Sequence, residues 1–219
     1  MLEYNGVKIR WFGHDSFLFE KGVRVVADPY KIAGPLEADL VLVSHNHFDH
    51  MSIEDLQKVA SDKTTIVAAQ ECIEKLGDVK CKEKKALLPG QEMSVNGVRL
   101  KGVPAYNIDK INPDTKRPFH PKDDKKIGFL IEMGGTTIYH TGDSDLVPEM
   151  ENLRPDVLLV PVSGTYVMTA SEAARAVGVI RPKVAIPMHY GSIVGSERDA
   201  KEFSEAVRDC KVHVLSRES

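Results

Sequence analysis

Three histidines and an aspartate fall within six positions of this chain, directly after a short apolar run. The run covers residues 40–43, and the polar residues that follow it are His45, His47, Asp49 and His50. Neutral imidazoles and a carboxylate are preferred ligands of zinc and similar divalent ions. These residue types at this spacing predict a metal site, whereas ordinary surface histidines in a polar loop would not explain the spacing.

The elements around the cluster decide which side chains can share an ion. In an extended segment, alternate side chains lie on one face, so His45 and His47 can point at the same ion. Asp49 and His50 follow after the chain has turned, and they can face a second ion beside the first. Ser52 is typical of a helix N-cap, with acidic residues in the first turn after it. We therefore expect the cluster at a strand-to-helix turn.

Two later residues could complete the ligand shell. Asp143 follows a predicted strand beside a glycine, where a carboxylate can bridge two ions or, alternatively, cap a turn. His189 lies at the carboxyl end of a predicted buried parallel strand, the place where α/β proteins carry functional groups. A lone histidine there is more often structural, but together with the loop cluster we interpret it as a ligand.

Apolar patterns and turn residues predict an α/β fold with many strands. Strands are expected at residues 7–12, 16–20, 23–27, 40–43, 65–68, 86–88, 92–95, 98–103, 128–133, 136–139, 157–161, 184–187 and 211–215, and helices at 52–60, 70–76, 169–180 and 197–208. Antiparallel strands in each half, with helices between strands, indicate two packed sheets with helices outside. The irregular stretch 104–126 holds four prolines and is typical of a lid or binding loop.

Length and composition narrow the class of protein. The chain has 219 residues, which suits a single domain over residues 1–219. A net charge of −3 gives no general attraction to nucleic acid, and no apolar run approaches the roughly 18 residues of a membrane span. Three scattered cysteines and the lack of a visible signal peptide make the cytoplasm the expected location.

Taken together, these motifs resemble those of the metallo-β-lactamase-fold hydrolase superfamily. They are, in chain order, Ser44-His45-x-His47-x-Asp49-His50, Thr141-Gly142-Asp143 and Pro187-Met188-His189-Tyr190-Gly191. Gly13-His14-Asp15-Ser16-Phe17 and Ala27-Asp28-Pro29 further resemble the branch that includes ascorbate-6-phosphate lactonase. The resemblance covers nearly the whole chain. It implies a four-layer αββα sandwich with the site at one edge of the two sheets.

The resemblance also implies how six ligands divide between two ions. His45 and His47 would hold the first ion, Asp49, His50 and His189 the second, and Asp143 would bridge them. The family usually adds a third histidine to the first ion, from a Pro-Ala-x-His type segment. That segment here begins at Pro104, and Asn107 stands where the histidine is expected.

Three explanations for the missing histidine stay open. His120 could approach from the long loop, Asn107 or Tyr106 could bind weakly or through water, or the first position could be weakly filled. Tyr106 and His120 are the loop residues expected to face the site.

Three further residues are expected near the ligands. Asp28 could accept a hydrogen bond from a ligand imidazole and fix its tautomer, although an Asp-Pro turn is the simpler alternative. His14 could approach the substrate or lie behind the ligands. His140 is expected to be buried beside the site and not to be a ligand.

Two neighbouring divalent ions can hold a hydroxide at neutral pH and polarise a carbonyl or phosphoryl oxygen. Asp49 could orient that hydroxide. The leading prediction is therefore a metal-dependent hydrolase of a small ester, lactone or phosphodiester, with one or two ions that are zinc or, alternatively, manganese or iron. The alternatives are a nuclease acting on RNA or DNA, a non-haem iron redox enzyme, and a metal-binding protein without turnover. A small-molecule substrate is expected, with no nucleic acid or membrane partner and no predicted oligomeric state.

Overall fold

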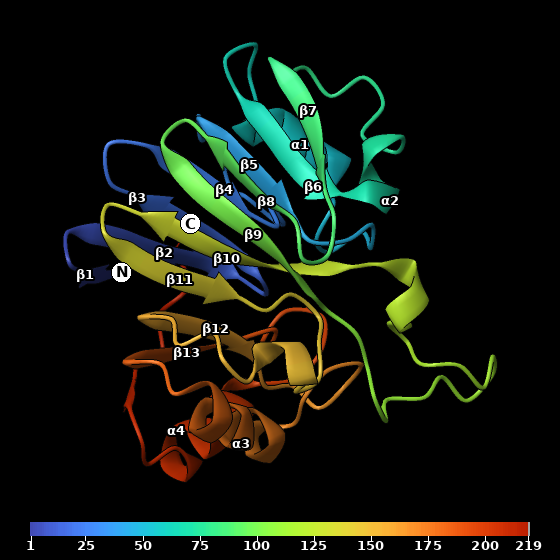
Figure 1. Cartoon of the computed structure of the whole chain (residues 1–219), viewed down its shortest axis with the longest axis vertical. Coiled ribbons are helices and arrows are strands. Elements are labelled where there is room, and N and C mark those ends of the chain that lie inside the picture. Colours follow the sequence, from blue (N-terminus) through green and yellow to red (C-terminus); the bar gives the residue numbers. More distant parts are fainter. Residues whose placement is uncertain (219) are drawn as a thin grey trace.

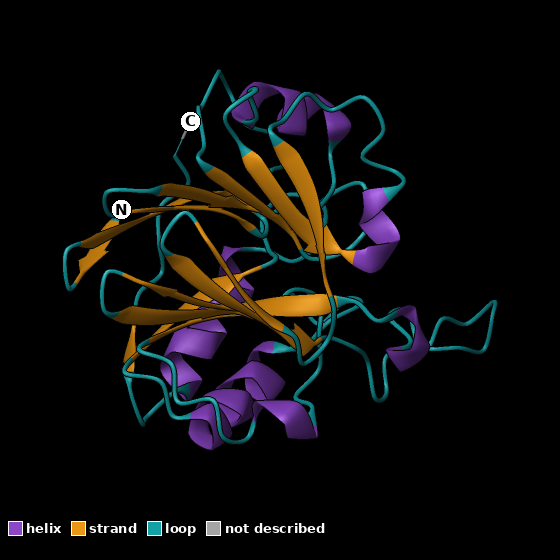
Figure 2. Ribbon diagram, turned by 45° about the horizontal axis from the view of Figure 1, so that its top comes forward, coloured by secondary structure: helices purple, strands orange, loops and turns teal. Residues whose placement is uncertain are grey.

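Two β-sheets pack face to face, and helices cover their outer sides (Figure 1, Figure 2). The computed structural model describes residues 1–218, so the last residue of the domain predicted over 1–219 lies outside the described residues. The four layers follow each other as helices, sheet, sheet and helices. This arrangement confirms the predicted αββα sandwich.

The N-terminal part of the chain forms the first sheet, whose seven strands within residues 1–218 are adjacent in chain order. They are β1 (Leu2–Tyr4), β2 (Val7–Gly13), β3 (Ser16–Glu20), β4 (Arg24–Ala27), β5 (Leu40–Val43), β6 (Thr65–Ala69) and β7 (Glu83–Leu87). Helices α1 (Ile53–Val59) and α2 (Gln70–Ile73) connect β5 to β6 and β6 to β7. The strands are antiparallel from β1 to β4 and parallel from β4 to β7.

The C-terminal part forms the second sheet with the same arrangement of strands. Its strands are β8 (Glu92–Val95), β9 (Val98–Pro104), β10 (Ile127–Met133), β11 (Thr136–His140), β12 (Val157–Pro161), β13 (Val184–Met188) and β14 (Lys211–Val212). Helices α3 (Ala170–Ile180) and α4 (Glu197–Ala206) cover it, and 3-10 turns η1 (Lys122–Asp124) and η2 (Pro148–Met150) lie in its loops. Pairing is antiparallel from β8 to β11 and parallel from β11 to β14.

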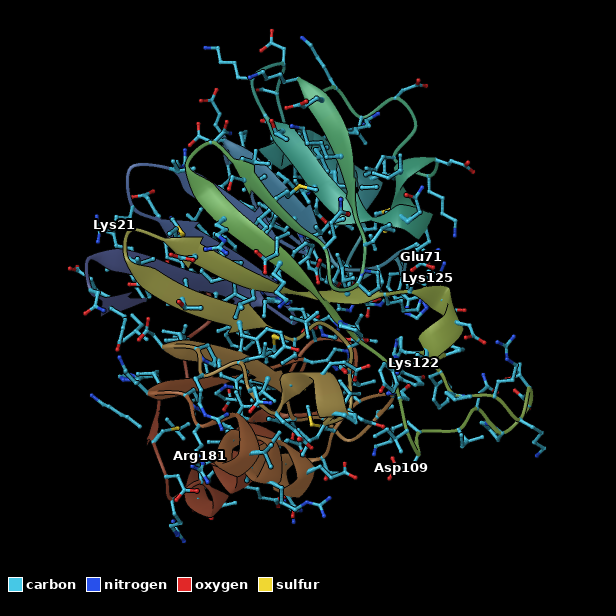
Figure 3. All side chains as sticks on the ribbon, viewed as in Figure 1. Lys21, Glu71, Asp109, Lys122, Lys125 and Arg181 are labelled. Atoms are coloured by element: carbon cyan, nitrogen blue, oxygen red, sulfur yellow. The ribbon has the colours of Figure 1, made fainter. Side chains whose placement is uncertain are left out.

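Apolar side chains of both sheets are buried in the core, whereas charged side chains such as Lys21, Lys122 and Arg181 lie at the periphery of the molecule (Figure 3). Phe17 and Phe19 of β3 stack with ring centroids 6.1 Å apart, and Leu42 and Phe129 are fully buried. At about 25 cal/mol per Å² of apolar surface, burial of such side chains is the main source of stability. No helix in the described part of the chain is long and apolar enough to cross a membrane.

Most predicted elements are confirmed, and four differ. The helix predicted over residues 70–76 ends at Ile73 as α2. β7 begins at residue 83 and not at 86. Its first residues, Glu83, Lys84 and Lys85, are charged, as is common on an edge strand, so the apolar pattern does not include them. β1 was not predicted, and β14 ends at Val212 although the pattern extended to residue 215. The predicted N-cap is present: the Ser52 side chain accepts from the Asp55 backbone amide at the start of α1.

Two contacts between the sheets bring the strand ends together. The backbone amide of Ile127, at the start of β10, donates to the carbonyl of Ser44, after β5. The backbone amide of His189, after β13, donates to the carbonyl of His14, after β2. The carboxyl ends of strands from both sheets therefore meet at one edge of the sandwich.

Gly128 permits the close approach of backbone that leads to this edge. A Cβ atom on Gly128 would lie 2.5 Å from the carbonyl oxygen of Thr141 and 2.7 Å from that of His140. These are backbone atoms of the segment that leads to Asp143, so they cannot move away as a flexible side chain would. A glycine is required here because of space.

We expect Gly128→Ala to lower the free energy of unfolding by about 1–3 kcal/mol, the usual cost of overpacking. Denaturant unfolding followed by circular dichroism measures the change. Gly34→Ala is the matched control, because a Cβ at Gly34 meets nothing within 4 Å and the backbone is not left-handed. Equal stability of the two variants would contradict the steric argument.

Candidate metal centre

The candidate residues converge at the edge where the strand ends meet. They come from the turn after β2, the loop after β5, the long loop before β10, the segment after β11 and the end of β13. Within the described residues, eight side chains form two groups. Inside each group, the donor atoms all lie within 4.8 Å of one another. The first group is His45, His47, His120 and Asp143, and the second is His14, Asp15, His50 and His189.

In the first group, His120 occupies the place that the sequence left open. Its Nε2 lies 3.3 Å from Oδ2 of Asp143, and the Nε2 of His45 lies 3.9 Å from the same oxygen. The His120 ring is 5.0 Å from that of His47, centroid to centroid. The long loop thus brings a third imidazole to the His45–His47 pair.

Asn107 holds this imidazole from behind and is not turned toward the cluster. Its Oδ1 accepts from the His120 backbone amide at 2.9 Å and lies 3.0 Å from the ring Nδ1. Because a carboxamide oxygen only accepts, the ring hydrogen is on Nδ1 and Nε2 is left with a free lone pair. The expectation that Tyr106 faces the site is wrong, since its hydroxyl donates to Glu149 at 3.0 Å.

In the second group, Asp143 again links the members. Its Oδ1 lies 3.3 Å from Nε2 of His50, and its Oδ2 lies 3.3 Å from Nε2 of His189. Asp49 lies beside this group. Its Oδ2 accepts from Nε2 of His14 at 2.9 Å and is 4.0 Å from Nε2 of His50.

Hydrogen bonds at the Nδ1 atoms fix the orientation of three further rings. Oδ2 of Asp28 lies 2.8 Å from Nδ1 of His50, as the sequence suggested for Asp28, and also accepts from the Ser44 hydroxyl at 2.6 Å. Nδ1 of His45 lies 3.0 Å from the Ser44 Oγ, and Nδ1 of His189 lies 3.0 Å from a serine Oγ, that of Ser163. Each ring therefore directs Nε2 toward the cluster.

The charged groups of this cluster shift one another's pKa values. Burial would raise the pKa of Asp143, but His189 and His50 outweigh it and hold that pKa well below the usual range. Burial would lower the pKa of His189, but Asp143 and Asp15 raise it to about 9. Burial lowers the pKa of His120 to about 4 and that of His45 well below its usual value.

The buried polar atoms that lack partners fit a divalent ion. Among the described residues, the Nε2 atoms of His45, His50 and His120 make no hydrogen bond, nor does Oδ1 of Asp143. Unpaired buried polar atoms cost about 1–3 kcal/mol each, so a folded chain normally satisfies them. Imidazole nitrogens and carboxylate oxygens that converge in this way are the donor set of zinc, manganese and iron sites.

Three residues of the centre have left-handed backbone conformations. The φ angles are 51° at His14, 43° at Asp28 and 60° at His189. Such conformations in residues other than glycine cost about 1–3 kcal/mol each and persist where surrounding bonds enforce them. Here the backbone bonds of the turn and the side-chain bonds of the imidazoles enforce them.

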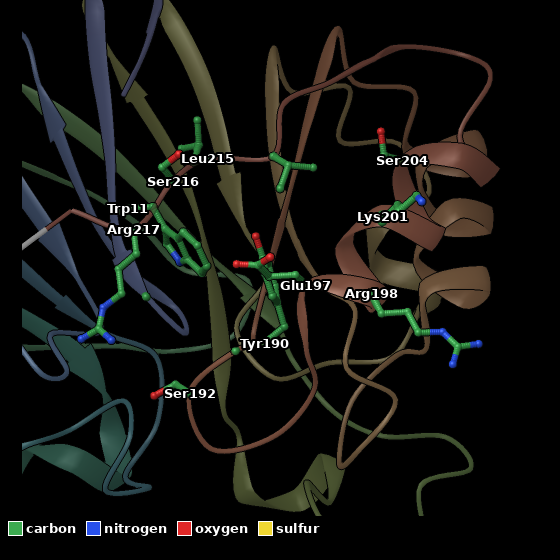
Figure 4. A pocket seen from close by; sticks show the side chains of 13 residues that line it. Trp11, Tyr190, Ser192, Glu197, Arg198, Lys201, Ser204, Leu215, Ser216 and Arg217 are labelled. Carbon is green, nitrogen blue, oxygen red and sulfur yellow. The ribbon is translucent and has the colours of Figure 1, made fainter.

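Two cavities lie near the centre. One of about 460 Å³ opens onto it and is lined by Asn46, His47, Phe48, Asp49, Phe119, His120, Asp143, Tyr166 and Ile193. A larger one, of about 890 Å³, lies beyond Tyr190, between Trp11, α4 and the C-terminal segment (Figure 4). None of the eight clustered side chains is among the described residues that line the larger cavity. The smaller cavity is the entrance to the centre.

Sequence reasoning did not single out Asp15. This side chain is fully buried, and burial raises the pKa of its carboxyl group. Its position beside His14 in the Gly13-His14-Asp15-Ser16-Phe17 motif was the available signal. His140 is buried as predicted, and its Nε2 donates to the carbonyl of Asp15 at 2.8 Å.

The chain belongs to the beta-lactamase superfamily, whose domain model, described as "Beta-lactamase superfamily domain", matches residues 8–189. It is similar to a UPF0173 metal-dependent hydrolase of Archaeoglobus fulgidus, with 30% identity over 92% of this chain and 91% of the relative. It is also similar to one of Methanosphaerula palustris, with 32% identity over 95% and 96% of the two chains. The enzyme class that these relatives define is metal-dependent hydrolase, and this chain is a member of that class.

Solved structures agree on the fold. A structure described as a metal-dependent hydrolase, from Parabacteroides distasonis, has a TM-score of 0.80 and 28% identity, and covers 95% of this chain and 92% of its own. The metallo hydrolase Igni18 from Ignicoccus hospitalis has a TM-score of 0.76 over 97% and 96% of the chains, and at 24% identity it supports the fold alone. The predicted metallo-β-lactamase type of sandwich is thereby confirmed. The narrower resemblance to ascorbate-6-phosphate lactonase is not confirmed by these relatives.

His120→Ala should weaken divalent metal binding at one position by about 10- to 100-fold, because an imidazole that faces Asp143 is lost. Asn107→Ala should cause a smaller loss, since the ring would remain but its orientation would not be fixed. Metal content after loading and dialysis, measured by mass spectrometry, tests both. His213→Ala, which removes a histidine outside the two groups, is the control, and metal content equal to this control would remove His120 from the centre.

Proposed function

We propose that this chain is a metal-dependent hydrolase of small neutral esters or lactones that carry an apolar group next to the scissile bond. The main support for this proposal is the cavity of about 460 Å³, which is lined by residues of metal-binding types and by apolar side chains. Catalytic sites commonly combine an apolar pocket with a few convergent polar groups.

The apolar side chains around this cavity are unusually exposed for their type. Phe48 is 66% exposed, Tyr166 41% and Ile193 40%, and the Phe119 ring packs edge-on against Tyr166 with centroids 4.7 Å apart. One exposed apolar residue needs no explanation, but several around one cavity indicate a surface that binds an apolar group. An acyl chain or aryl group of a substrate fits this description.

The charges around the cavity favour a neutral substrate over a phosphodiester. Among the described residues that line it, none is lysine or arginine. Burial lowers the pKa of His47, and the nearby charge of Lys126 lowers it further. The ammonium group of Lys126 is itself buried and paired with Glu71 at 2.8 Å. A phosphodiester would thus find no free cationic side chain among these residues, whereas an ester or lactone requires none.

We assign the first metal position to His45, His47 and His120, the second to Asp49, His50 and His189, and Asp143 to both. A divalent ion in such a site polarises a carbonyl oxygen and lowers the pKa of water from about 15.7 toward about 7. The imidazole-rich first position suits zinc, with manganese or iron as alternatives. Cys72, Cys81 and Cys210 are free thiols, which supports the cytoplasm as location.

Asp49 is the residue that we expect to orient the attacking water. Burial would raise its pKa, but the hydrogen bond from His14 and the charge of His50 hold it at about 2. At neutral pH the carboxylate is therefore ionised, so it accepts hydrogen bonds and does not carry a proton. Its side chain lines the cavity, where a water molecule next to a bound ester can reach it.

The other functions that the sequence left open are less well supported. Relatives that match nearly the whole chain are named metal-dependent hydrolases. A nuclease would gain from cations near the cavity, and the described lining supplies none. None of these relatives is named a redox enzyme or a metal-binding protein without turnover.

Asp49→Ala should lower kcat/KM for any responsive ester or lactone by about 100- to 10,000-fold, the usual contribution of a positioned acid–base group. The far-UV circular dichroism should not change, because Asp49 lies in a loop and not in a strand. Turnover of p-nitrophenyl esters, lactones and bis(p-nitrophenyl) phosphate would be measured with zinc and with manganese. Asp123→Ala on the η1 turn is the control, and equal turnover by both variants would refute the assignment.

Phe48→Ala should raise KM for esters with long or aromatic acyl groups and leave acetyl esters nearly unaffected. Loss of 1–2 kcal/mol of apolar contact corresponds to about a 5- to 30-fold lower kcat/KM for the long substrates. Leu88→Ala removes a similarly exposed apolar side chain, 42% exposed, from outside the cavity and serves as control. If acetyl and long-chain esters lose the same factor, the apolar rim does not bind substrate.

A further inference from the structure

We propose that Asp15, in the turn between β2 and β3, is a ligand of the second metal position. The inference rests on the metal centre of the proposed function and adds a carboxylate that the family resemblance does not assign. It places one anionic ligand behind the site, from the first sheet, in addition to Asp143 from the second.

The carboxylate of Asp15 is buried without a hydrogen-bond partner among the described residues. The residue is fully buried, and neither Oδ1 nor Oδ2 makes a hydrogen bond with the described residues. Moving an ionised carboxylate from water into a protein costs several kcal/mol unless a counter-charge and hydrogen bonds compensate. A metal ion in direct contact with these oxygens would supply that compensation.

Three imidazoles surround this carboxylate at distances that suit a shared ion. Oδ2 of Asp15 lies 3.5 Å from Nε2 of His14, 3.9 Å from Nε2 of His50 and 4.0 Å from Nε2 of His189. These distances exceed the 2.7–3.2 Å of a hydrogen bond, so the imidazoles do not satisfy the carboxylate directly. With ligand bonds of about 2.1 Å, two ligands of one ion lie at most about 4.2 Å apart, and the distances to His50 and His189 are within this limit.

The neighbouring carboxylate, Asp49, is already engaged. Nε2 of His14 lies 2.9 Å from Oδ2 of Asp49 and 3.5 Å from Oδ2 of Asp15, so its single hydrogen belongs to the shorter contact. Asp49 lines the cavity, whereas Asp15 does not. His14 thus holds Asp49 on the substrate side and leaves Asp15 to face His50 and His189 from behind.

The turn that carries Asp15 is fixed from several directions. The carbonyl of His14 accepts from the Trp11 indole at 2.9 Å and from the His189 backbone amide at 3.1 Å. The carbonyl of Asp15 accepts from Nε2 of His140, whose Nδ1 in turn accepts from the Gly142 amide at 3.2 Å. Such support is typical of a ligand that must keep its position before the ion binds.

The added carboxylate distinguishes the two positions chemically. The first position has three imidazoles and a share of Asp143. The second would have two imidazoles, Asp49, Asp15 and a share of Asp143. Since carboxylate oxygens suit manganese and imidazoles suit zinc, the second position should retain Mn²⁺ better than the first.

The test is a titration of metal-stripped protein with Mn²⁺, in which free Mn²⁺ is counted by its electron paramagnetic resonance signal. Wild type should bind two ions, and Asp15→Asn should lose at least about 100-fold in affinity for one of them, more than is usual for a residue behind the ligands. Asp15→Ala is titrated in parallel, so that the test stands even if one variant does not fold. Asp156→Asn is the control, because Asp156 binds Lys183 and the Thr137 amide, outside both groups.

Thermal unfolding separates a ligand from a structural carboxylate. Without metal, Asp15→Asn should melt at or above the wild-type temperature, since an unpaired buried charge is removed, whereas Asp156→Asn should melt lower. With Mn²⁺, wild type should gain more than Asp15→Asn. Wild-type Mn²⁺ affinity in Asp15→Asn and Asp15→Ala, or a lower melting temperature of Asp15→Asn without metal, would overturn the proposal.

Failure of the proposed function has a different signature. If wild type itself binds neither Mn²⁺ nor Zn²⁺, the metal centre and the role of Asp15 are both refuted. If wild type binds two ions and Asp15→Asn one, but no ester or lactone is hydrolysed, the substrate class fails and the assignment of Asp15 holds.

Discussion

The structure depends on one buried charge, the carboxylate of Asp143. Its two oxygens lie within 3.3–3.9 Å of the Nε2 atoms of four imidazoles, from His45, His50, His120 and His189. These imidazoles come from both sheets and from the long loop. A charge buried so deeply is tolerated only when its surroundings are arranged around it. The docking of the two sheets and the path of the long loop therefore both depend on the position of the Asp143 carboxylate.

The fold was predictable because apolar runs and turn residues agree along most of the chain. For example, the turn residues Asn96-Gly97 and Gly134-Gly135 separate predicted strands, and they form the hairpins between β8 and β9 and between β10 and β11. β7 was misplaced because charged residues on an edge strand hide its pattern. Local sequence describes local structure well, but charge at an edge carries no signal of pairing.

The candidate centre was predictable only in part, for a related reason. Candidate ligands that share one short loop are recognisable by their spacing, as His45 and His47 are. His120 could not be chosen over Asn107, because the long loop has no periodicity from which a direction could be inferred. The hydrogen bond between them decides the matter, and it joins residues 13 positions apart. Asp15 follows a strand as many turn acids do, and only its burial distinguishes it.

The left-handed backbone at His189 has a consequence for how this chain can change over time. Glycine would adopt a φ of 60° without strain, so a mutation from histidine to glycine there would relieve the backbone while it removed an imidazole. Under the ligand assignment proposed above, selection for a stable fold and selection for catalysis act in opposite directions at this codon. A copy of the gene released from catalytic duty would then be free to drift toward glycine at this position, and glycine in a descendant would fit loss of that duty.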